Sequence, residues 1–213
     1  MKWLSNVAVA SLLMSGLMPQ GLSAQESRPT QSPESRAVRE APKPGNLKPG
    51  DAIPSFLATT WDVSGETPKS SEFDSQKIPQ ITVIVIQGVK CPATSAYEGR
   101  LRELDLAYRK KGVEFLYLYP NRPESDELKR TYHKTQKLGG SMVFDAKGTL
   151  TQALGSDHTS DCYVVGKDGK VIYRGALDDN KRAAKVKVKY LADALEAALA
   201  GKEPSIKRTD APG

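Results

Sequence analysis

The sequence contains few of the residues that build metal, haem or nucleotide sites. Among its 213 residues are two cysteines and two histidines. His133 is far in sequence from both cysteines, and although His158 lies four residues before Cys162, no Cys-x-x-Cys or His-x-x-x-His spacing is present. A glycine-rich phosphate loop and the Gly-x-Ser-x-Gly turn of hydrolases are also missing. We therefore expect no metal and no cofactor, and any chemistry should come from the protein's own side chains.

Long apolar runs are scarce as well, and the one near the start is too short to span a membrane. Residues 7–18 are mostly apolar but fall short of the roughly 20 residues that a spanning helix needs. Lys2 precedes this run and a Leu-Ser-Ala sequence follows it at 22–24, as in a secretory signal with its cleavage site. We interpret residues 1–24 as a cleaved signal peptide. The protein should be exported, without stable membrane insertion: periplasmic if the organism has an outer membrane, and otherwise secreted.

Large apolar residues are also rare between positions 25 and 50, which predicts a disordered linker there. Residues 51–201 are enough for one domain with its own core, and a flexible tail is expected at 202–213. The net charge is +6, with many cations after residue 180. Such a run is usually a solvated face, and no nucleic-acid motif accompanies it, so we expect no nucleic-acid partner.

A strand, a helix and a second strand follow one another in the middle of the chain. Residues 81–86 are almost all apolar and mostly β-branched, which is typical of a strand buried on both faces. Apolar side chains then recur at helical spacing from Tyr97 to Tyr108, and Gly112 ends that helix. With a further strand at 113–119, this segment has the size of a right-handed βαβ unit with parallel strands.

The rest of the pattern predicts an antiparallel hairpin and further helices. Asp168-Gly169 between two apolar runs is a strong hairpin signal. The other expected elements are an edge strand or hairpin at 55–66, a helix at 124–137, a short strand at 141–144, hairpin strands at 162–165 and 170–173, and a final helix around 191–199. This order predicts an α/β protein with a thioredoxin-like fold: a central mixed sheet with a parallel βαβ unit and an antiparallel hairpin, and helices on both faces.

Cys91 is the strongest candidate for a reactive residue. It follows the buried strand at 81–86 and precedes Pro92, which suits the first position of a helix and so places Cys91 at the N-cap. The unpaired N–H groups and the positive end of the helix dipole favour a thiolate there. A thiolate attacks disulfides and peroxides. The alternative is a buried, inert cysteine.

Thr94 and Cys162 are two further candidates. Thr94 stands where a Cys-x-x-Cys motif has its second cysteine, and its hydroxyl either donates to the Cys91 thiolate or only caps the helix. Cys162 begins an apolar run, where a buried structural cysteine is the usual interpretation. Two alternatives stay open for Cys162: a thiol that resolves Cys91, or a Cys91–Cys162 disulfide, structural or cycling.

With these segments assigned, residues 50–201 resemble the redoxin branch of the thioredoxin superfamily, related to alkyl hydroperoxide reductase and thiol-specific antioxidant proteins. The resemblance rests on four segments: CPATSAYEGRL at 91–101, GVEF at 112–115, PNRPES at 120–125 and YRGALDD at 173–179. It implies thiol-based oxidoreductase or antioxidant activity with Cys91 as the attacking cysteine. Where thioredoxins carry a cis-proline facing the active site, this chain has Ser160, within Thr159-Ser160-Asp161.

Two hypotheses follow for the function. In the first, Cys91 attacks a protein disulfide or a peroxide, Lys90 and the helix N-terminus stabilise its thiolate, and an external thiol or a partner reductase regenerates it. In the second, the protein is a redox-inactive thioredoxin-like binding module that uses a sheet edge or its basic C-terminal region for a partner.

Overall fold

The computed structural model describes residues 46–120 and 123–211. The predicted signal peptide at 1–24 and nearly all of the predicted linker at 25–50 lie outside the described residues. The strands are β1 (Leu57–Asp62), β2 (Lys69–Asp74), β3 (Thr82–Ile86), β4 (Glu114–Tyr119), β5 (Ser141–Phe144), β6 (Cys162–Val165) and β7 (Val171–Gly175). The helices are α1 (Pro92–Arg109), α2 (Asp126–Thr135), α3 (Thr149–Leu154), the 3-10 helix η1 (Ala183–Lys185) and α4 (Tyr190–Leu199). Among the described helices, none has the length and apolar character needed to cross a membrane.

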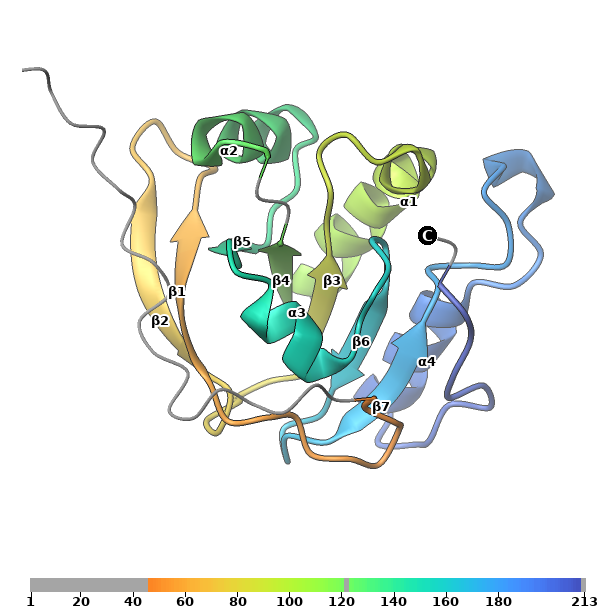
Figure 1. Ribbon diagram of the computed structural model, residues 1–213. Coiled ribbons are helices and arrows are strands. Elements are labelled where there is room, and N and C mark those ends of the chain that lie inside the picture. Colours follow the sequence, from red (N-terminus) through yellow and green to blue (C-terminus); the bar gives the residue numbers. More distant parts are fainter. Residues whose placement is uncertain (1–45, 121–122, 212–213) are drawn as a thin grey trace, which may run out of the picture. The chain divides into compact units, whose positions relative to one another are not determined.

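The strands form one mixed sheet in the order β2-β1-β5-β4-β3-β6-β7 (Figure 1). β4 pairs in parallel with β3 on one side and with β5 on the other. The pairs β1–β2, β1–β5, β3–β6 and β6–β7 are antiparallel. The predicted parallel βαβ unit is therefore β3-α1-β4, and the predicted hairpin is β6–β7.

β3 lies inside the sheet, between β4 and β6, and all five of its side chains are buried. Neighbouring residues of a strand point to opposite faces, so Val83 and Val85 join the core under α1, α2 and α4. Ile84 and Ile86 join the second core, which α3 covers with Leu150 and Leu154. Helices thus lie on both faces of the sheet, and the predicted α/β, thioredoxin-like architecture is confirmed.

The end of β3 positions the candidate site. β3 ends at Ile86, so Cys91 lies just beyond the carboxyl end of a central parallel strand, which is where open α/β sheets place ligand sites. β6 runs antiparallel to β3, and the loop before β6 therefore lies at the same edge. Two backbone hydrogen bonds fix this loop: the Ser160 N–H donates to the Ile86 carbonyl at 2.7 Å, and the Ile86 N–H donates to the Asp161 carbonyl at 3.0 Å.

Four parts of the described chain differ from what the sequence predicts. β2 lies beyond the edge strand or hairpin expected at 55–66. α3 was not expected, because six residues are too few to show a helical period. The fold begins before the expected boundary, since Leu47 is buried and the Gly50 N–H donates to the Val171 carbonyl at 2.7 Å. The tail expected to be flexible lies along β7 at residues 207–209, where Arg174 exchanges backbone hydrogen bonds of 3.0 and 3.1 Å with it.

Candidate functional site

Cys91 is the N-cap of α1, as Pro92 in the next position predicts. Its backbone is extended, with φ −90° and ψ 122°, and its carbonyl accepts a 3.1 Å hydrogen bond from the Ser95 N–H in the first helical turn. The residue is partly exposed, so another molecule can approach the sulfur. The positive end of a long helix dipole favours a thiolate at this point.

A hydroxyl from a distant loop contacts the Cys91 sulfur. Thr159 Oγ1 lies 2.9 Å from Cys91 Sγ. Burial by itself raises the pKa of the Cys91 thiol, but the Thr159 hydroxyl and the backbone N–H groups of Thr94 and Ala93 outweigh it, and the pKa is lowered. These contacts increase the fraction of reactive thiolate.

Thr94, in the first turn of α1, faces the loop that carries Thr159 and Ser160. Its side chain is buried, and its Oγ1 lies 3.5 Å from Ser160 Oγ. Ser160 has φ +70°, in the left-handed region that non-glycine residues rarely adopt. No described peptide bond is cis. The Ser160 hydroxyl therefore lies next to α1.

Cys162 lies below this loop, at the start of β6. It is 2% exposed, and its thiol donates to the Ser160 carbonyl at 3.5 Å. Burial, followed by the charges of Asp161 and Asp178, raises the pKa of the Cys162 thiol well above its usual value. Both cysteines are free thiols, so the structure contains no Cys91–Cys162 disulfide. A thiolate is disfavoured at Cys162 and favoured at Cys91.

A buried carboxylate holds the turn that leads to Cys91. Glu124 precedes α2 and accepts hydrogen bonds from the N–H groups of Val89 at 3.3 Å and Lys90 at 3.0 Å. Without Glu124 these backbone donors would need another partner. The Lys90 side chain itself is exposed. The Lys90 backbone N–H helps to fix the turn. The main groups that lower the pKa of Cys91 are the hydrogen-bond donors of Thr159, Thr94 and Ala93, rather than the charge of the Lys90 side chain.

This arrangement supports attack by sulfur. A partly exposed thiolate reacts with a disulfide sulfur or with a peroxide oxygen, and each reaction needs access to Cys91 Sγ. Within residues 46–120 and 123–211, no three His, Cys, Asp or Glu side chains come together where they could hold a metal ion.

The sequence model of the redoxin family matches residues 48–195, well over half of the chain. The chain belongs to the redoxin family. Among curated proteins, none matches it at a significant level.

Several solved structures share the fold of this redoxin. An uncharacterised conserved protein from Geobacillus kaustophilus is 25% identical with a TM-score of 0.67, and the match covers 76% of this chain and 88% of that one. A thio-disulfide isomerase from Thermus thermophilus is 21% identical with a TM-score of 0.53, covering 71% and 97%. The peroxidoxin BcpB from Mycobacterium tuberculosis is 16% identical with a TM-score of 0.52, covering 73% and 97%. These similarities agree with the thioredoxin-like architecture of the sheet.

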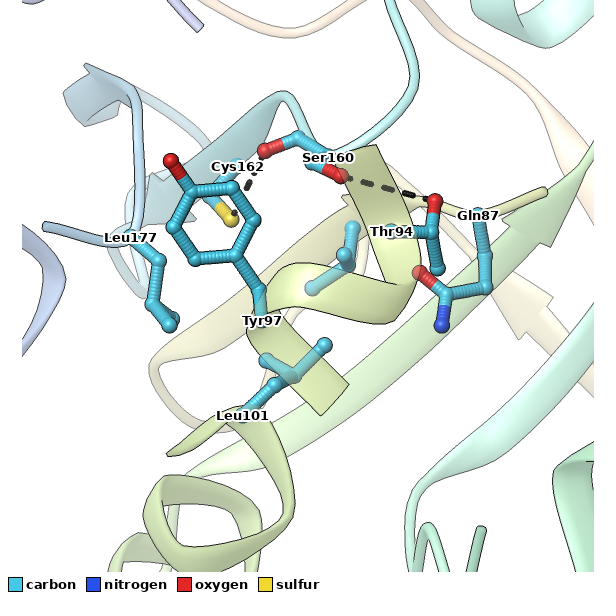
Figure 2. Close-up of a pocket in the computed structure, with 8 residues that line it drawn as sticks. Gln87, Thr94, Tyr97, Leu101, Ser160, Cys162 and Leu177 are labelled. Atoms are coloured by element: carbon cyan, nitrogen blue, oxygen red, sulfur yellow. Dashed lines mark hydrogen bonds between the residues drawn. The ribbon is translucent and has the colours of Figure 1, made fainter. Parts of the chain in front are cut away.

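A small cavity lies behind the site of this redoxin. Figure 2 shows Thr94, Ser160 and Cys162 around it, together with Gln87. Its volume is about 10 Å³, close to the space that one water molecule requires. Gln87 is almost fully buried; its Nε2 donates to the Tyr132 hydroxyl at 3.3 Å, whereas its Oε1 accepts no hydrogen bond from a described residue. The interior behind Cys91 is therefore closely packed and partly polar.

Two contacts of the site, made by Thr159 and Glu124, cannot be predicted from the residues next to them in the sequence. Glu124 stands in one of the four segments on which the resemblance rests, and Thr159 directly precedes Ser160, but the sequence marks neither residue as a neighbour of Cys91 or of its turn. Thr159 is 68 residues from Cys91, and Glu124 is 34 residues from Lys90. Only the pairing of β3 with β6 and the position of the β4–α2 connection bring these side chains to the site.

We expect Thr159→Val to raise the pKa of Cys91 by about one to two units. Valine replaces the hydroxyl by a methyl group, and a hydrogen bond to a charged group contributes roughly 1.5–3 kcal/mol, where one pKa unit corresponds to about 1.4 kcal/mol. The rate of Cys91 alkylation by iodoacetamide, followed against pH, measures this pKa. Thr159→Ser keeps the hydroxyl and should keep the wild-type profile. Identical profiles for Thr159→Val and the wild type would exclude Thr159 as the donor.

Proposed function

We propose that this redoxin is an exported thiol-disulfide oxidoreductase in which Cys91 is the single attacking thiol. The observation that carries the proposal is the partly exposed Cys91 sulfur at the N-terminus of α1, 2.9 Å from the Thr159 hydroxyl and with a lowered pKa. Thr94 assists through its backbone N–H and its hydroxyl. Export rests on the predicted signal peptide at 1–24.

The reaction takes place in two exchanges. The Cys91 thiolate attacks one sulfur of a protein disulfide, a Cys91–substrate disulfide forms, the original S–S bond breaks, and the other sulfur leaves as a thiolate. A thiol of a small molecule or of a partner reductase then attacks the mixed disulfide. When this thiol attacks Cys91 Sγ, the substrate leaves with its second sulfur as a thiolate, and a Cys91–donor disulfide forms. A second external thiol then attacks the donor sulfur, which releases the Cys91 thiolate and joins the two donor thiols in a disulfide.

An external thiol is proposed because Cys162 is poorly placed to resolve the mixed disulfide. Its thiol is 2% exposed, and burial raises its pKa, so little thiolate forms. Attack by a thiol requires both access and thiolate character.

The pH dependence of alkylation in the mature protein tests the proposal. In wild type and Cys162→Ser, we expect one thiol to react with a pKa below the roughly 8.5 of free cysteine. Cys91→Ser should leave only the slow labelling of Cys162. The same three proteins are then mixed with a model protein disulfide and with hydrogen peroxide. Exchange that depends on Cys91, and faster reaction with the disulfide than with the peroxide, is the expected result.

A binding module without redox activity is the second candidate, and it is favoured by the absence of a second motif cysteine at Thr94. Equal, slow labelling of Cys91 and Cys162 with no exchange would overturn the oxidoreductase proposal and support the module. Rapid oxidation of Cys91 by peroxide to a sulfenic acid, with no exchange, would assign peroxidase chemistry instead.

A further inference from the structure

Five cations lie in one exposed segment between β7 and α4, and we call this the basic segment. Its charged members are Lys181, Arg182, Lys185, Lys187 and Lys189. The sequence from 181 to 189 contains no acidic residue, and none of the five side chains forms an ion pair with a described residue. The positive charge of this segment is therefore open to another molecule.

The backbone of the basic segment aligns part of this charge. Lys185, Lys187 and Lys189 are exposed and alternate with Val186 and Val188, which are half-buried. Val186 is extended, with φ −64° and ψ 126°. Lys185, Lys187 and Lys189 thus share the exposed side of the segment.

Acidic residues beside the segment are already engaged. Asp178 forms an ion pair with Arg100, with an Nε–Oδ2 distance of 2.6 Å. Asp179 Oδ1 accepts the Lys187 N–H at 2.9 Å, and the Asp179 N–H donates to the Val188 carbonyl at 3.1 Å. These contacts hold the segment in place. Asp179 also interacts electrostatically with Lys187, and Asp179 and Asp210 line a pocket with Lys181, so the five cations outnumber the acidic groups beside them.

The basic segment lies beside α1, the helix that carries Cys91. η1 contacts α1, and Arg100 Nη2 donates to the Asn180 carbonyl at 2.9 Å. Arg100 is nine residues from Cys91, which corresponds to about 14 Å along a helix. Figure 1 shows the segment, in blue, at the same end of the sheet as the start of α1. At low salt the screening length of about 30 Å is roughly twice the distance along α1 between Arg100 and Cys91.

We propose that the disulfide partner of Cys91 is an acidic polypeptide, held by the basic segment while its disulfide meets the thiolate. The inference rests on the proposed function. A row of cations at the rim of a reactive site raises the encounter rate of an oppositely charged partner and fixes its orientation. A polypeptide fits better than a small disulfide because the cations extend along nine residues and lie to one side of Cys91.

Three synthetic peptides test the choice of partner. Each carries one cysteine blocked as a mixed disulfide with 2-thiopyridine, and they differ only in having aspartate, serine or lysine at the other variable positions. The Cys91 thiolate attacks the peptide sulfur, a Cys91–peptide disulfide forms, and the pyridinethiolate leaves and is followed by its absorbance. At low salt, the aspartate peptide should react about tenfold faster than the lysine peptide. This ratio should shrink at physiological salt, where screening shortens to about 8 Å.

Matched charge variants locate the effect. Lys185→Gln/Lys187→Gln/Lys189→Gln should slow the aspartate peptide about threefold or more and leave the serine peptide unchanged. The control Lys77→Gln/Lys167→Gln/Lys170→Gln removes the same formal charge at the other end of the sheet, where Lys77 and Lys170 lie 3.4 Å and 3.8 Å from Asp74 and Asp168. It should leave both rates unchanged.

Each outcome has a separate meaning. Equal rates for the three peptides, or equal losses in the two triple variants, would overturn this inference and leave the proposed function intact. No reaction with any peptide would overturn the proposed function and this inference with it. Equal peptide rates together with loss of binding to anionic phospholipid vesicles in the Lys185/Lys187/Lys189 variant would assign the segment to a membrane surface instead.

Discussion

Replacing Arg174 with leucine is expected to lower the free energy of unfolding by about 3–5 kcal/mol. Arg174 is buried in β7, and its guanidinium lies 3.2 Å from Asp161 Oδ2. It also donates to the carbonyls of Leu47 at 3.1 Å and Gly155 at 2.6 Å, and to Asn46 Oδ1 at 3.1 Å. Removing one partner of a buried ion pair leaves the other charge uncompensated, which carries a cost of that size.

Urea titration at neutral pH measures this loss, and a double-variant cycle with Asp161→Asn separates the pair from its surroundings. Asp161 is buried, and burial raises its pKa even though Arg174 opposes the shift. The double variant should therefore recover part of the loss seen in Arg174→Leu. The exposed residue Arg182 provides the control, since Arg182→Leu should change stability by no more than about 0.5 kcal/mol. A similar small change in Arg174→Leu would contradict the expected role of the pair.

The Arg174–Asp161 pair also connects the core to the site. Asp161 belongs to the loop that carries Thr159 and Ser160, and its backbone carbonyl accepts the Ile86 N–H. A loop released from Arg174 would hold the Thr159 hydroxyl less firmly against Cys91. The same variant should therefore shift the Cys91 alkylation profile toward higher pH, in the direction expected for Thr159→Val.

Local patterns account for the parts of the fold that the sequence predicts well. The nearly continuous apolar run predicts β3, and Cys91-Pro92 predicts the start of α1. Both signals depend on neighbouring residues only. The same kind of information places Cys91 beyond the carboxyl end of a buried strand. The resemblance to the redoxin family also draws attention to Arg174, within the segment at 173–179, but it does not identify Asp161 as the ion-pair partner of Arg174.

Contacts across the sheet account for the parts that the sequence does not predict. Thr159 reaches Cys91 only because β6 pairs antiparallel with β3, and Arg174 meets Asp161 only because β7 pairs with β6. The docking of the tail is of the same kind: Thr209 Oγ1 accepts the Ala176 N–H at 2.9 Å. Charge and polarity at 202–213 favour a free tail, and hydrogen bonds to β7 outweigh that tendency at 207–209.

A buried histidine should make this redoxin lose stability in mild acid. His133 in α2 is 1% exposed, and its Nε2 lies 2.9 Å from the Gly140 carbonyl. A carbonyl only accepts, so Nε2 carries the proton and Nδ1 accepts the Tyr119 hydroxyl, at 2.9 Å. Burial, outweighing the opposing hydrogen bonds, lowers the pKa of His133 to about 4. The folded chain therefore keeps His133 neutral at pH values where an unfolded chain protonates it.

The sign of the pH effect follows from proton binding. Between the unfolded pKa of about 6.5 and the folded pKa of about 4, the unfolded chain binds more protons at this residue, so stability falls as the pH falls. From pH about 7.5 to about 4.5 the loss from His133 alone is about 2.5 kcal/mol. Asp145 and Asp161, whose pKa values burial raises, act in the opposite direction. The comparison must therefore cancel their contribution.

His133→Gln provides that comparison, because glutamine offers a donor and an acceptor but does not titrate. Urea titrations of both proteins at the two pH values should show that the wild type loses about 2.5 kcal/mol more than the variant on acidification. The variant is expected to be less stable than the wild type at neutral pH, and the difference between them should narrow in acid. Parallel losses in the two proteins would mean that His133 titrates alike in the folded and unfolded chains, against the geometry of its two hydrogen bonds. The His133 ring resonances give an independent measure, since they should not move until the pH approaches about 5.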